Sequence, residues 1–440
     1  MLKYLFYLLV LIYIILYKMV LNIVDVFLGV MFLMMIYFFG MIDNWAEVGS
    51  MMGVDKVSLF LIMLTVIIFY FVMFDYSGNL YGLGYNFILV FMIFFLVILF
   101  SIVDLFTFYL VFEASLIPIF LIIMGWGAHS ERLGASIYLM MYMLVSSLPM
   151  MIVLMFLNHS LFYMKMIYME EFTGKMIVYF LVVLMFAVKF PLFILHLWLP
   201  SAHVEAPVGG SMILAGILLK LGGYGLYRFM KLIYYMGMNL NVMFIVVSLV
   251  GMFLVSLNCL CQVDIKSLVA YSSVVHMCVS LLGIMSLSMW GLSGFVVLMI
   301  SHGLCSSGLF YLIGVVYHRF MSRSLYLSKG LMICMPSMGL GWFLLSVSNL
   351  SAPPSLNLLG ELMVLGGLLY WSLISLLILI FIMFFSAFYS LYMFSYLHHG
   401  DLYGGSVSGS LNSGMLSEYL VVYYHFIPLN VIFLMGDLFN

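Results

Sequence analysis

Charged residues are the class that this sequence has least of. Only 7% of its 440 residues are Asp, Glu, Lys or Arg, whereas 67% are hydrophobic, and the mean hydropathy is +1.30. A soluble domain carries about 25% charged residues. The composition therefore excludes a soluble globular protein and predicts a polytopic membrane protein. Because the sequence has no basic patch that could neutralise phosphates, nucleic acid is not expected as a partner.

Cysteine is also scarce, and the motifs of cofactor binding are missing. The five cysteines lie in apolar sequence without CxxC spacing, so we expect neither a metal site nor a disulfide. No GxGxxG motif opens a helix after a strand, which argues against nucleotide binding. The ten histidines do not form the repeated pairs that a bis-histidine haem bundle needs. We therefore expect no redox cofactor in this chain.

What the sequence has instead is a series of long apolar runs. About 20 apolar residues can cross a bilayer core, and polar stretches between the runs are too short for a soluble domain. We predict an all-α polytopic membrane protein, a single membrane domain over residues 1–440. Its fourteen expected transmembrane helices are 2–17, 20–41, 56–74, 83–103, 105–124, 134–157, 176–198, 208–230, 238–258, 266–286, 290–315, 331–370, 373–397 and 418–436.

Four ionisable residues fall inside these runs, where charge is costly. A charged side chain at the centre of a bilayer costs roughly 2.5–3.5 kcal/mol on insertion scales, so such residues are rare and usually functional. Three histidines, His196, His276 and His302, accompany them, and His196, beside the polar stretch 201–207, is expected to be a loop or interface residue. The six candidate site residues are Glu113, Lys189, Lys220, His276, His302 and Glu361.

Proline lies close to three of these charges. Pro118 follows Glu113, Pro191 follows Lys189, and a proline pair precedes Glu361. A proline inside a helix frees a backbone carbonyl, and in a membrane such a break is tolerated where it faces protein or a hydrated cavity. We therefore predict broken helices at these places, including the seventh and the twelfth span. The polar stretch 201–207 is expected to be a loop that joins two spans.

The order of the buried groups suggests an internal repeat. Glu113 and Lys189 lie on the fifth and seventh spans, and His276 and Glu361 lie on the tenth and twelfth at similar separations. Interrupted helices at corresponding positions of two halves indicate repeats with ion sites near the midplane. Because five spans are an odd number, the two copies must be inverted. We predict one repeat over 83–230 (helices 4–8) and one over 238–397 (helices 9–13).

Such a row of groups can pass protons by coupling charges. At about 4 Å and an effective dielectric of 20, an opposite-charge pair is worth roughly 4 kcal/mol, which is about three pKa units. Moving Lys189 between Glu113 and Lys220 would load or release the proton of the neighbour. Two other readings stay open: the Glu113–Lys189 pair only holds two helices together, or the whole chain is a structural scaffold with buried salt bridges.

The stretch KFPLFILHLWLPSAHVEAPVGGSMILAGILLKLGGYG (189–225) resembles the antiporter-like membrane subunits of NADH:ubiquinone oxidoreductase, respiratory complex I. Further similar stretches are FEASLIPIFLIIMGWG (112–127), QVDIKSLVAYSSVVHM (262–277), ISHGLCSSGLFYL (300–312) and PPSLNLLGEL (353–362). Together they cover the chain from about residue 100 to 370. Val275 is a departure, since the family usually has serine there.

The resemblance implies a function and a role for each residue. Glu113 and Lys189 would form the ion pair of helices 5 and 7, and Lys220 would be the central lysine of helix 8. His276 and His302 would link it to Glu361, the terminal proton-exchanging carboxylate. Glutamate at this last position favours one member of the family over its two sister subunits, which usually carry lysine.

The same resemblance implies a location for the chain, its partner subunits and the cofactors that those subunits bind. The chain would be a proton-translocating subunit of NADH:ubiquinone reductase in the mitochondrial inner membrane. NADH, FMN, Fe–S clusters and ubiquinone would be bound by partner subunits, and this chain would carry out no redox chemistry itself. Its partners would be other membrane-arm subunits of complex I, especially the antiporter-like subunits 2 and 5, and lipids. The alternative within the resemblance is a subunit of an Mrp-type cation/proton antiporter.

Overall fold

The computed structural model describes residues 52–75, 82–160, 165–167, 176–369, 371–401 and 414–439. Apart from three isolated β-bridges, the regular structure of these residues is helical. The elements are α3 (Lys56–Asp75), α4 (Gly82–Ser101), α5 (Leu105–Ala114), α6 (Leu116–Trp126), α7 (Arg132–Ser160), α8 (Met176–Lys189), α9 (Trp198–Glu205), α10 (Val208–Ile213), the π-helix η2 (Leu214–Leu218), α11 (Leu219–Leu232), α12 (Tyr234–Leu260), α13 (Ile265–Met285), α14 (Met289–Phe320), α15 (Leu331–Cys334), α16 (Pro336–Asn349), α17 (Leu356–Leu369), α18 (Leu373–His398), α19 (Leu416–Val431) and the 3-10 helix η4 (Ile432–Phe439).

The described helices agree with the expected membrane spans. Ten helical segments are long and apolar enough to cross a membrane, and α8 and α17 are shorter apolar helices. The predicted spans 2–17 and 20–41 lie outside the described residues. The predicted span 331–370 is divided between α16 and α17 by a non-helical segment that contains the proline pair, and the predicted span 176–198 ends as a helix at Lys189. The prediction of an all-helical polytopic membrane protein is confirmed.

One expectation about the middle of the chain is wrong. The polar stretch 201–207 was expected to be a loop, but its first five residues belong to α9. Pro200 is the third residue of that helix, in the first turn, where a missing N–H costs no hydrogen bond. A short polar sequence can therefore continue as helix, and only Ala206 and Pro207 separate α9 from α10.

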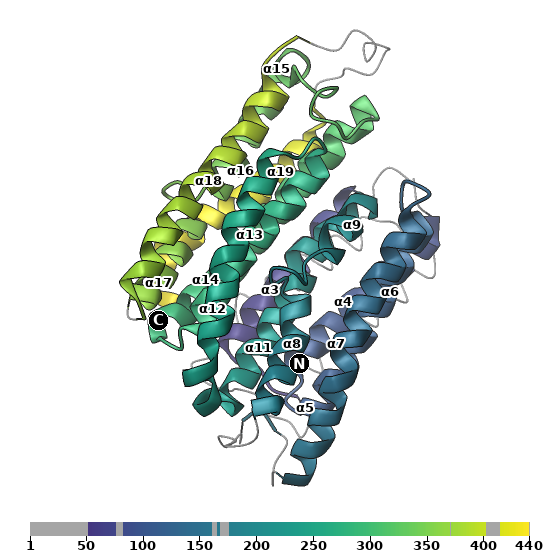
Figure 1. Cartoon of the computed structure of the whole chain (residues 1–440). Helices are drawn as coiled ribbons and strands as arrows, with labels where there is room; N and C mark the ends of the chain where they lie inside the picture. Colours follow the sequence, from purple (N-terminus) through teal and green to yellow (C-terminus); the bar gives the residue numbers. More distant parts are fainter. Residues whose placement is uncertain are drawn as a thin grey trace. The chain divides into compact units, whose positions relative to one another are not determined.

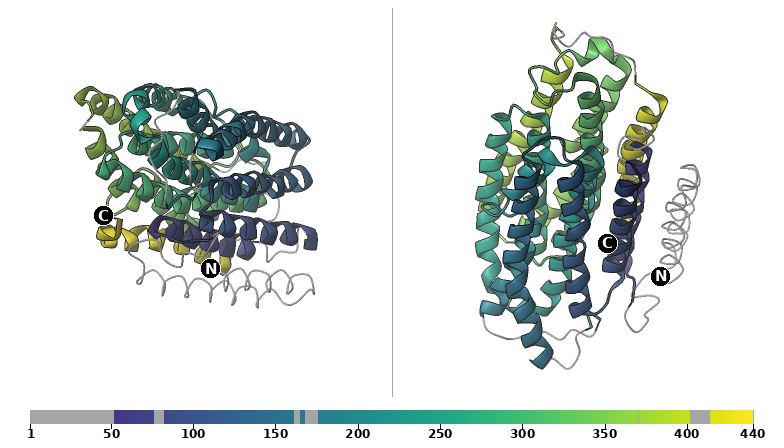
Figure 2. Two further views of the ribbon diagram at one scale, coloured as in Figure 1. Left: turned by 90° about the horizontal axis from the view of Figure 1, so that it is seen from below. Right: turned by 90° about the vertical axis from the view of Figure 1, so that its right-hand side faces the viewer.

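The chain divides into two compact units. Unit 1 contains residues 1–189 and 205–237, and unit 2 contains residues 190–204 and 238–440. The long helices within each unit run roughly parallel or antiparallel to one another (Figures 1 and 2). In unit 1, α11 packs against α8, and α3 packs against α4. In unit 2, α14 packs against α13, α16, α17 and α19.

The contact between α8 and α11 depends on a glycine. A Cβ atom placed on Gly225 would overlap the ring of Phe186, so the α11 backbone touches that ring directly. Phe186 is itself held by the rings of Phe112 and Phe229, whose centroids lie 5.8 and 5.2 Å away. Small residues at helix interfaces allow this close approach. The packing brings the end of α8, with Lys189, against the helix that carries Lys220.

A buried ion pair joins the C-terminal part of α11 to the residue that precedes α3. Arg228 Nη2 donates to Asp55 Oδ1 at 2.5 Å, and the arginine side chain is only 1% exposed. Asp55 also accepts from the Ser58 N–H at 3.0 Å, in the first turn of α3. Burial raises the pKa of Asp55, but the charge and hydrogen bond of Arg228 and the bonds from Ser58 outweigh it and hold the pKa below its ordinary value of 3.8.

The glycine contact can be tested by adding one methyl group. We expect Gly225→Ala to destabilise the fold by about 1–3 kcal/mol, because overpacking forces a well-packed core to shift. The measurement is unfolding of the purified chain in detergent micelles. Gly134→Ala is the matched control, since nothing lies within 4 Å of a Cβ at Gly134, and it should be neutral or stabilising by up to about 1 kcal/mol. Equal stability of the two variants would contradict this packing.

The ion pair gives a prediction with a pH dependence. Asp55→Asn removes the counter-charge of a buried arginine, which we expect to cost about 3 kcal/mol near neutral pH. Because the folded pKa of Asp55 is depressed, the contribution is complete above pH 3.8 and is lost as the pH falls through the lower, folded pKa. The stability difference between the wild type and Asp55→Asn should therefore shrink only below about pH 4. Asp401→Asn, at an exposed residue, should show no such difference at any pH.

Candidate functional site

The first polar group lies in unit 1, where α8 ends at Lys189. Its Nζ lies 3.9 Å from Glu113 Oε1 and donates to the Phe112 carbonyl at 3.2 Å. It also stands 2.9 Å from the centre of the Phe112 ring. Lys189 is 4% exposed and Glu113 is 19% exposed. The structure thus surrounds one buried ammonium with a carboxylate, a carbonyl and an aromatic face, all of which favour its charged form.

The Phe112 carbonyl lies at an interruption between two helices. α5 ends at Ala114 and α6 begins at Leu116, with Ser115 between them. Pro118, one turn further on, has no N–H to donate to the carbonyl of Ala114. The Phe112 carbonyl accepts from the Ser115 hydroxyl at 2.7 Å as well as from Lys189. The predicted coincidence of charge and helix break is confirmed here.

Lys220 occupies a different kind of irregularity in unit 1. It is fully buried and is the second residue of α11, directly after the π-helix η2. Its Nζ donates to the carbonyl of Ala215, inside η2, at 2.7 Å. Single turns of π-helix inside α-helices occur frequently at functional sites. The lysine therefore bends back to a backbone oxygen of its own helix.

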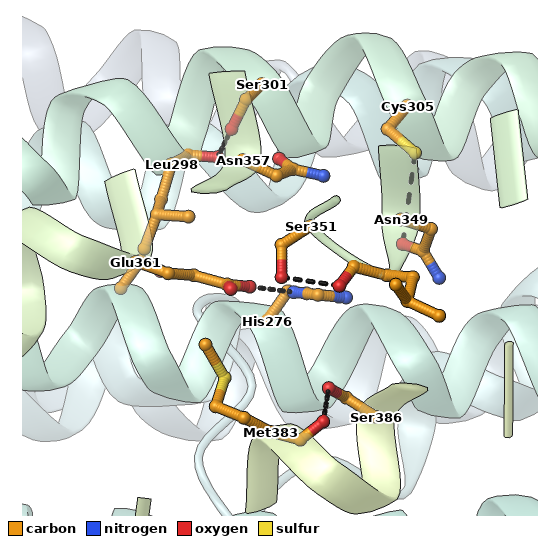
Figure 3. A network of polar contacts seen from close by, with 12 residues as sticks. His276, Leu298, Ser301, Cys305, Asn349, Ser351, Asn357, Glu361, Met383 and Ser386 are labelled. Atoms are coloured by element: carbon orange, nitrogen blue, oxygen red, sulfur yellow. Dashed lines mark hydrogen bonds and ion pairs between the residues drawn. The ribbon is translucent and has the colours of Figure 1, made fainter. Parts of the chain in front are cut away.

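The second polar group lies in unit 2 and involves three helices. His276 Nδ1 on α13 lies 3.5 Å from Glu361 Oε1 on α17, and both side chains are at most 3% exposed. The ring of His302 on α14 is centred 5.6 Å from the His276 ring. Figure 3 shows the Glu361 carboxylate pointing at one edge of the His276 ring. Unit 2 thus brings together His276, His302 and Glu361, and unit 1 brings together Glu113 and Lys189.

A cluster of neutral polar residues beside this group was missed by the sequence reasoning. Asn357 Nδ2 donates to the Ser348 carbonyl at 2.7 Å, across the break between α16 and α17. Cys305 on α14 lies 3.3 Å from the Ser348 hydroxyl and 3.9 Å from Asn349 Oδ1. One signal was available, because Asn357 precedes Glu361 by four residues and therefore lies on the same helix face.

The described residues offer no evident place for a metal ion. Within them, no group of three or more His, Cys, Asp or Glu side chains lies close enough together to bind one. The five cysteines, all within the described residues, form no disulfide, and three of them are buried. What the site contains is a set of groups that can hold and exchange protons.

Comparisons with known proteins give the family. The family model of the NADH:quinone oxidoreductase/Mrp antiporter transmembrane region matches residues 102–386. NADH-ubiquinone oxidoreductase chain 4 of Ceratitis capitata is 44% identical over 404 residues, which cover 90% of this chain and 90% of that protein. The protein of the same name from Rhipicephalus sanguineus is 41% identical over 91% of this chain and 92% of its own length.

Two solved structures share the fold. A chain of respiratory complex I from Thermus thermophilus superposes with a TM-score of 0.89 and 22% identity, covering 99% of this chain and 95% of that one. A chain of the Mrp complex from Dietzia superposes with a TM-score of 0.87 and 16% identity, covering 98% and 93%. The fold is therefore common to both complexes, and the sequence identities to the relatives decide between them. The chain belongs to the NADH:quinone oxidoreductase/Mrp antiporter family and, within it, to the NADH-ubiquinone oxidoreductase chain 4 proteins.

Proposed function

We propose that this chain is a proton-translocating membrane-arm subunit of NADH:ubiquinone oxidoreductase in the mitochondrial inner membrane. Family membership supports the assignment. The observation that carries the proton chemistry is that each unit pairs a carboxylate with a buried base. Glu113 lies 3.9 Å from Lys189 beside the interruption between α5 and α6, and Glu361 lies 3.5 Å from His276 on the helix that follows the break between α16 and α17. NADH, FMN, Fe–S clusters and ubiquinone belong to partner subunits in this proposal. The nearest partners are the antiporter-like subunits 2 and 5, together with lipids.

The proposed relay consists of Glu113, Lys189, Lys220, His276, His302 and Glu361. Lys189 keeps its proton while the Glu113 charge is near, because an opposite charge at about 4 Å is worth roughly 4 kcal/mol at an effective dielectric of 20. Once that charge is screened or moved away, burial favours release of the proton. Lys220 takes part in the same exchange from the adjacent helix. His276 and His302 carry the proton to Glu361, the terminal carboxylate.

We also propose that the chain has fourteen transmembrane helices, of which ten form two inverted repeats, 83–230 and 238–397. Two corresponding pairings support this. The Val103 carbonyl, just before α5, accepts from the N–H of Met166, which follows α7. The Val263 carbonyl, just before α13, accepts from the N–H of Leu325, which follows α14. The same backbone connection thus recurs at the fifth and the tenth helix.

Neutralising the first carboxylate tests the relay. We expect Glu113→Gln to leave the complex assembled but to lower coupled proton pumping at least about tenfold, since a change of 1.36 kcal/mol already gives that factor. The measurement is proton uptake driven by NADH oxidation in vesicles that contain the complex. Glu131→Gln, at an exposed residue, is the control. Undiminished pumping in Glu113→Gln would contradict the relay.

Replacing the buried lysine separates the competing functions. Lys220→Met keeps the length of the side chain but cannot carry a proton, and loss of a proton-transfer group typically costs about 10²-fold or more in rate. We expect that loss with the complex still assembled, and no effect from Lys329→Met at an exposed lysine. Failed assembly alone would favour a scaffold instead. Sodium-dependent transport by the isolated chain would favour the Mrp-type antiporter.

A further inference from the structure

The break between α16 and α17 is bridged by a side chain. Asn357, the second residue of α17, is fully buried and donates from Nδ2 to the carbonyl of Ser348, near the end of α16. This hydrogen bond joins the two half-helices across the segment that contains Ser351, which has a left-handed backbone conformation. The carbonyls at the end of a helix lack their usual intrahelical donors. The Ser348 carbonyl accepts from the Ser351 N–H at 3.2 Å and, at the shorter distance of 2.7 Å, from the Asn357 amide.

The end of α16 is tied in turn to α14. Cys305 Sγ lies 3.3 Å from the Ser348 hydroxyl and donates to the Leu345 carbonyl at 3.6 Å. Cys305 follows His302 by three residues, so the thiol and the imidazole leave α14 on the same side. The residue that Asn357 holds is therefore anchored next to the histidine part of the site.

Two contacts then determine where the Glu361 carboxylate lies. At Gly360, α17 rests directly on α14, because a Cβ atom there would lie 2.7 Å from Leu298 Cγ. This contact sets the distance between the two helices. Asn357 sets the position of α17 along its axis, and it lies one turn before Glu361 on the same face. Figure 3 shows the Glu361 carboxylate directed at the His276 ring, and it labels Asn357 and Ser351 in the same polar network.

We propose that Asn357 is a positioning residue for Glu361. Its amide donor keeps α17 in register with α16, so that the Glu361 carboxylate stays 3.5 Å from His276. The inference rests on the proposed function, because it assigns Asn357 a part in proton exchange at Glu361. It predicts that loss of the donor disturbs pumping, even where the shape of the side chain is kept.

Aspartate makes this test sharp because it matches asparagine in shape. A protonated carboxylic acid has one O–H donor, whereas an ionised carboxylate only accepts. In Asn357→Asp the bond to the Ser348 carbonyl is therefore present at low pH and absent at high pH. Asn349→Asp is the matched control, because Asn349 is also buried at this break but uses Oδ1 as an acceptor from Cys305. An aspartate accepts there in either protonation state.

Other titratable groups on the surrounding helices are present equally in both variants. They are His276 on α13, His302 and Cys305 on α14, Glu361 on α17, Tyr389 on α18 and His425 on α19. On α16, the residues nearest the break, Ser348 and Asn349, do not titrate in the wild type. Comparing the ratio of the two variants at each pH removes the contribution of these shared groups. The added carboxyl lies nearer to Glu361 along the chain in Asn357→Asp than in Asn349→Asp, so Asn357→Leu, which removes the donor without adding a charge, separates loss of the donor from the effect of the new charge.

The experiment measures protons pumped per NADH oxidised against pH, with each variant in the assembled complex reconstituted into vesicles. We expect the Asn357→Asp activity to equal that of Asn349→Asp at the acid end and to fall below it as the pH rises. The activity ratio of Asn357→Asp to Asn349→Asp should pass from about one tenth to about nine tenths of its total decrease over about two pH units, as for any single titrating group. Asn357→Leu, which cannot donate at any pH, should be low throughout.

Three results would count against the positioning role of Asn357 or against the proposed function. A constant ratio between the Asn357→Asp and Asn349→Asp variants at all pH values would overturn the positioning role. So would failure of Asn357→Asp to assemble while Asn349→Asp assembles, since that would show a role in folding alone. Glu361→Gln is measured in parallel. Normal pumping by that variant would refute the proposed function itself, whereas its loss together with a constant ratio would refute only the role of Asn357.

Discussion

A polar hydrogen-bonding group in an apolar interior must find its partner within the protein, and this constraint governs three buried donors of the structure. Lys189 reaches the Phe112 carbonyl, Lys220 reaches the Ala215 carbonyl, and Asn357 reaches the Ser348 carbonyl. In each case the acceptor lies at an irregularity of a helix: an interruption, a π-turn or an end. A regular helix uses its carbonyls internally. At the breaks, these donors meet carbonyls outside the regular helical pattern.

How far the sequence could predict this arrangement depends on the kind of signal. Charge in an apolar run is conspicuous, so Glu113, Lys189, Lys220 and Glu361 could be selected without a structure. Proline marks a broken helix through its missing N–H, which located the interruption near Glu113. The π-turn before Lys220 has no such marker, because its sequence LAGIL is ordinary helix-forming sequence. The acceptor of Lys220 was therefore beyond prediction.

Neutral polar residues were missed for a related reason. Serine and asparagine occur widely in membrane helices, and their importance depends on which carbonyl they meet in three dimensions. Asn357 donates to a residue nine positions earlier, across a segment whose path no periodicity describes. Close packing is equally hard to predict, because the glycines near Lys220 are compatible both with space for water and with direct contact between helices. At Gly225 the structure shows contact, with the ring of Phe186.

The fold alone does not distinguish the possible functions. Chains of a respiratory complex and of an Mrp complex superpose on this one almost equally well, so the arrangement of helices is compatible with both. The function proposed for this chain therefore rests on its few buried charges and on the groups that hold them. Residue 361 is a glutamate, which is negative when ionised, whereas a lysine would be positive when protonated. The two residues would therefore have opposite effects on the proton affinity of His276. The function proposed for this chain therefore depends less on the arrangement of its helices than on where they break and which charges lie near the breaks.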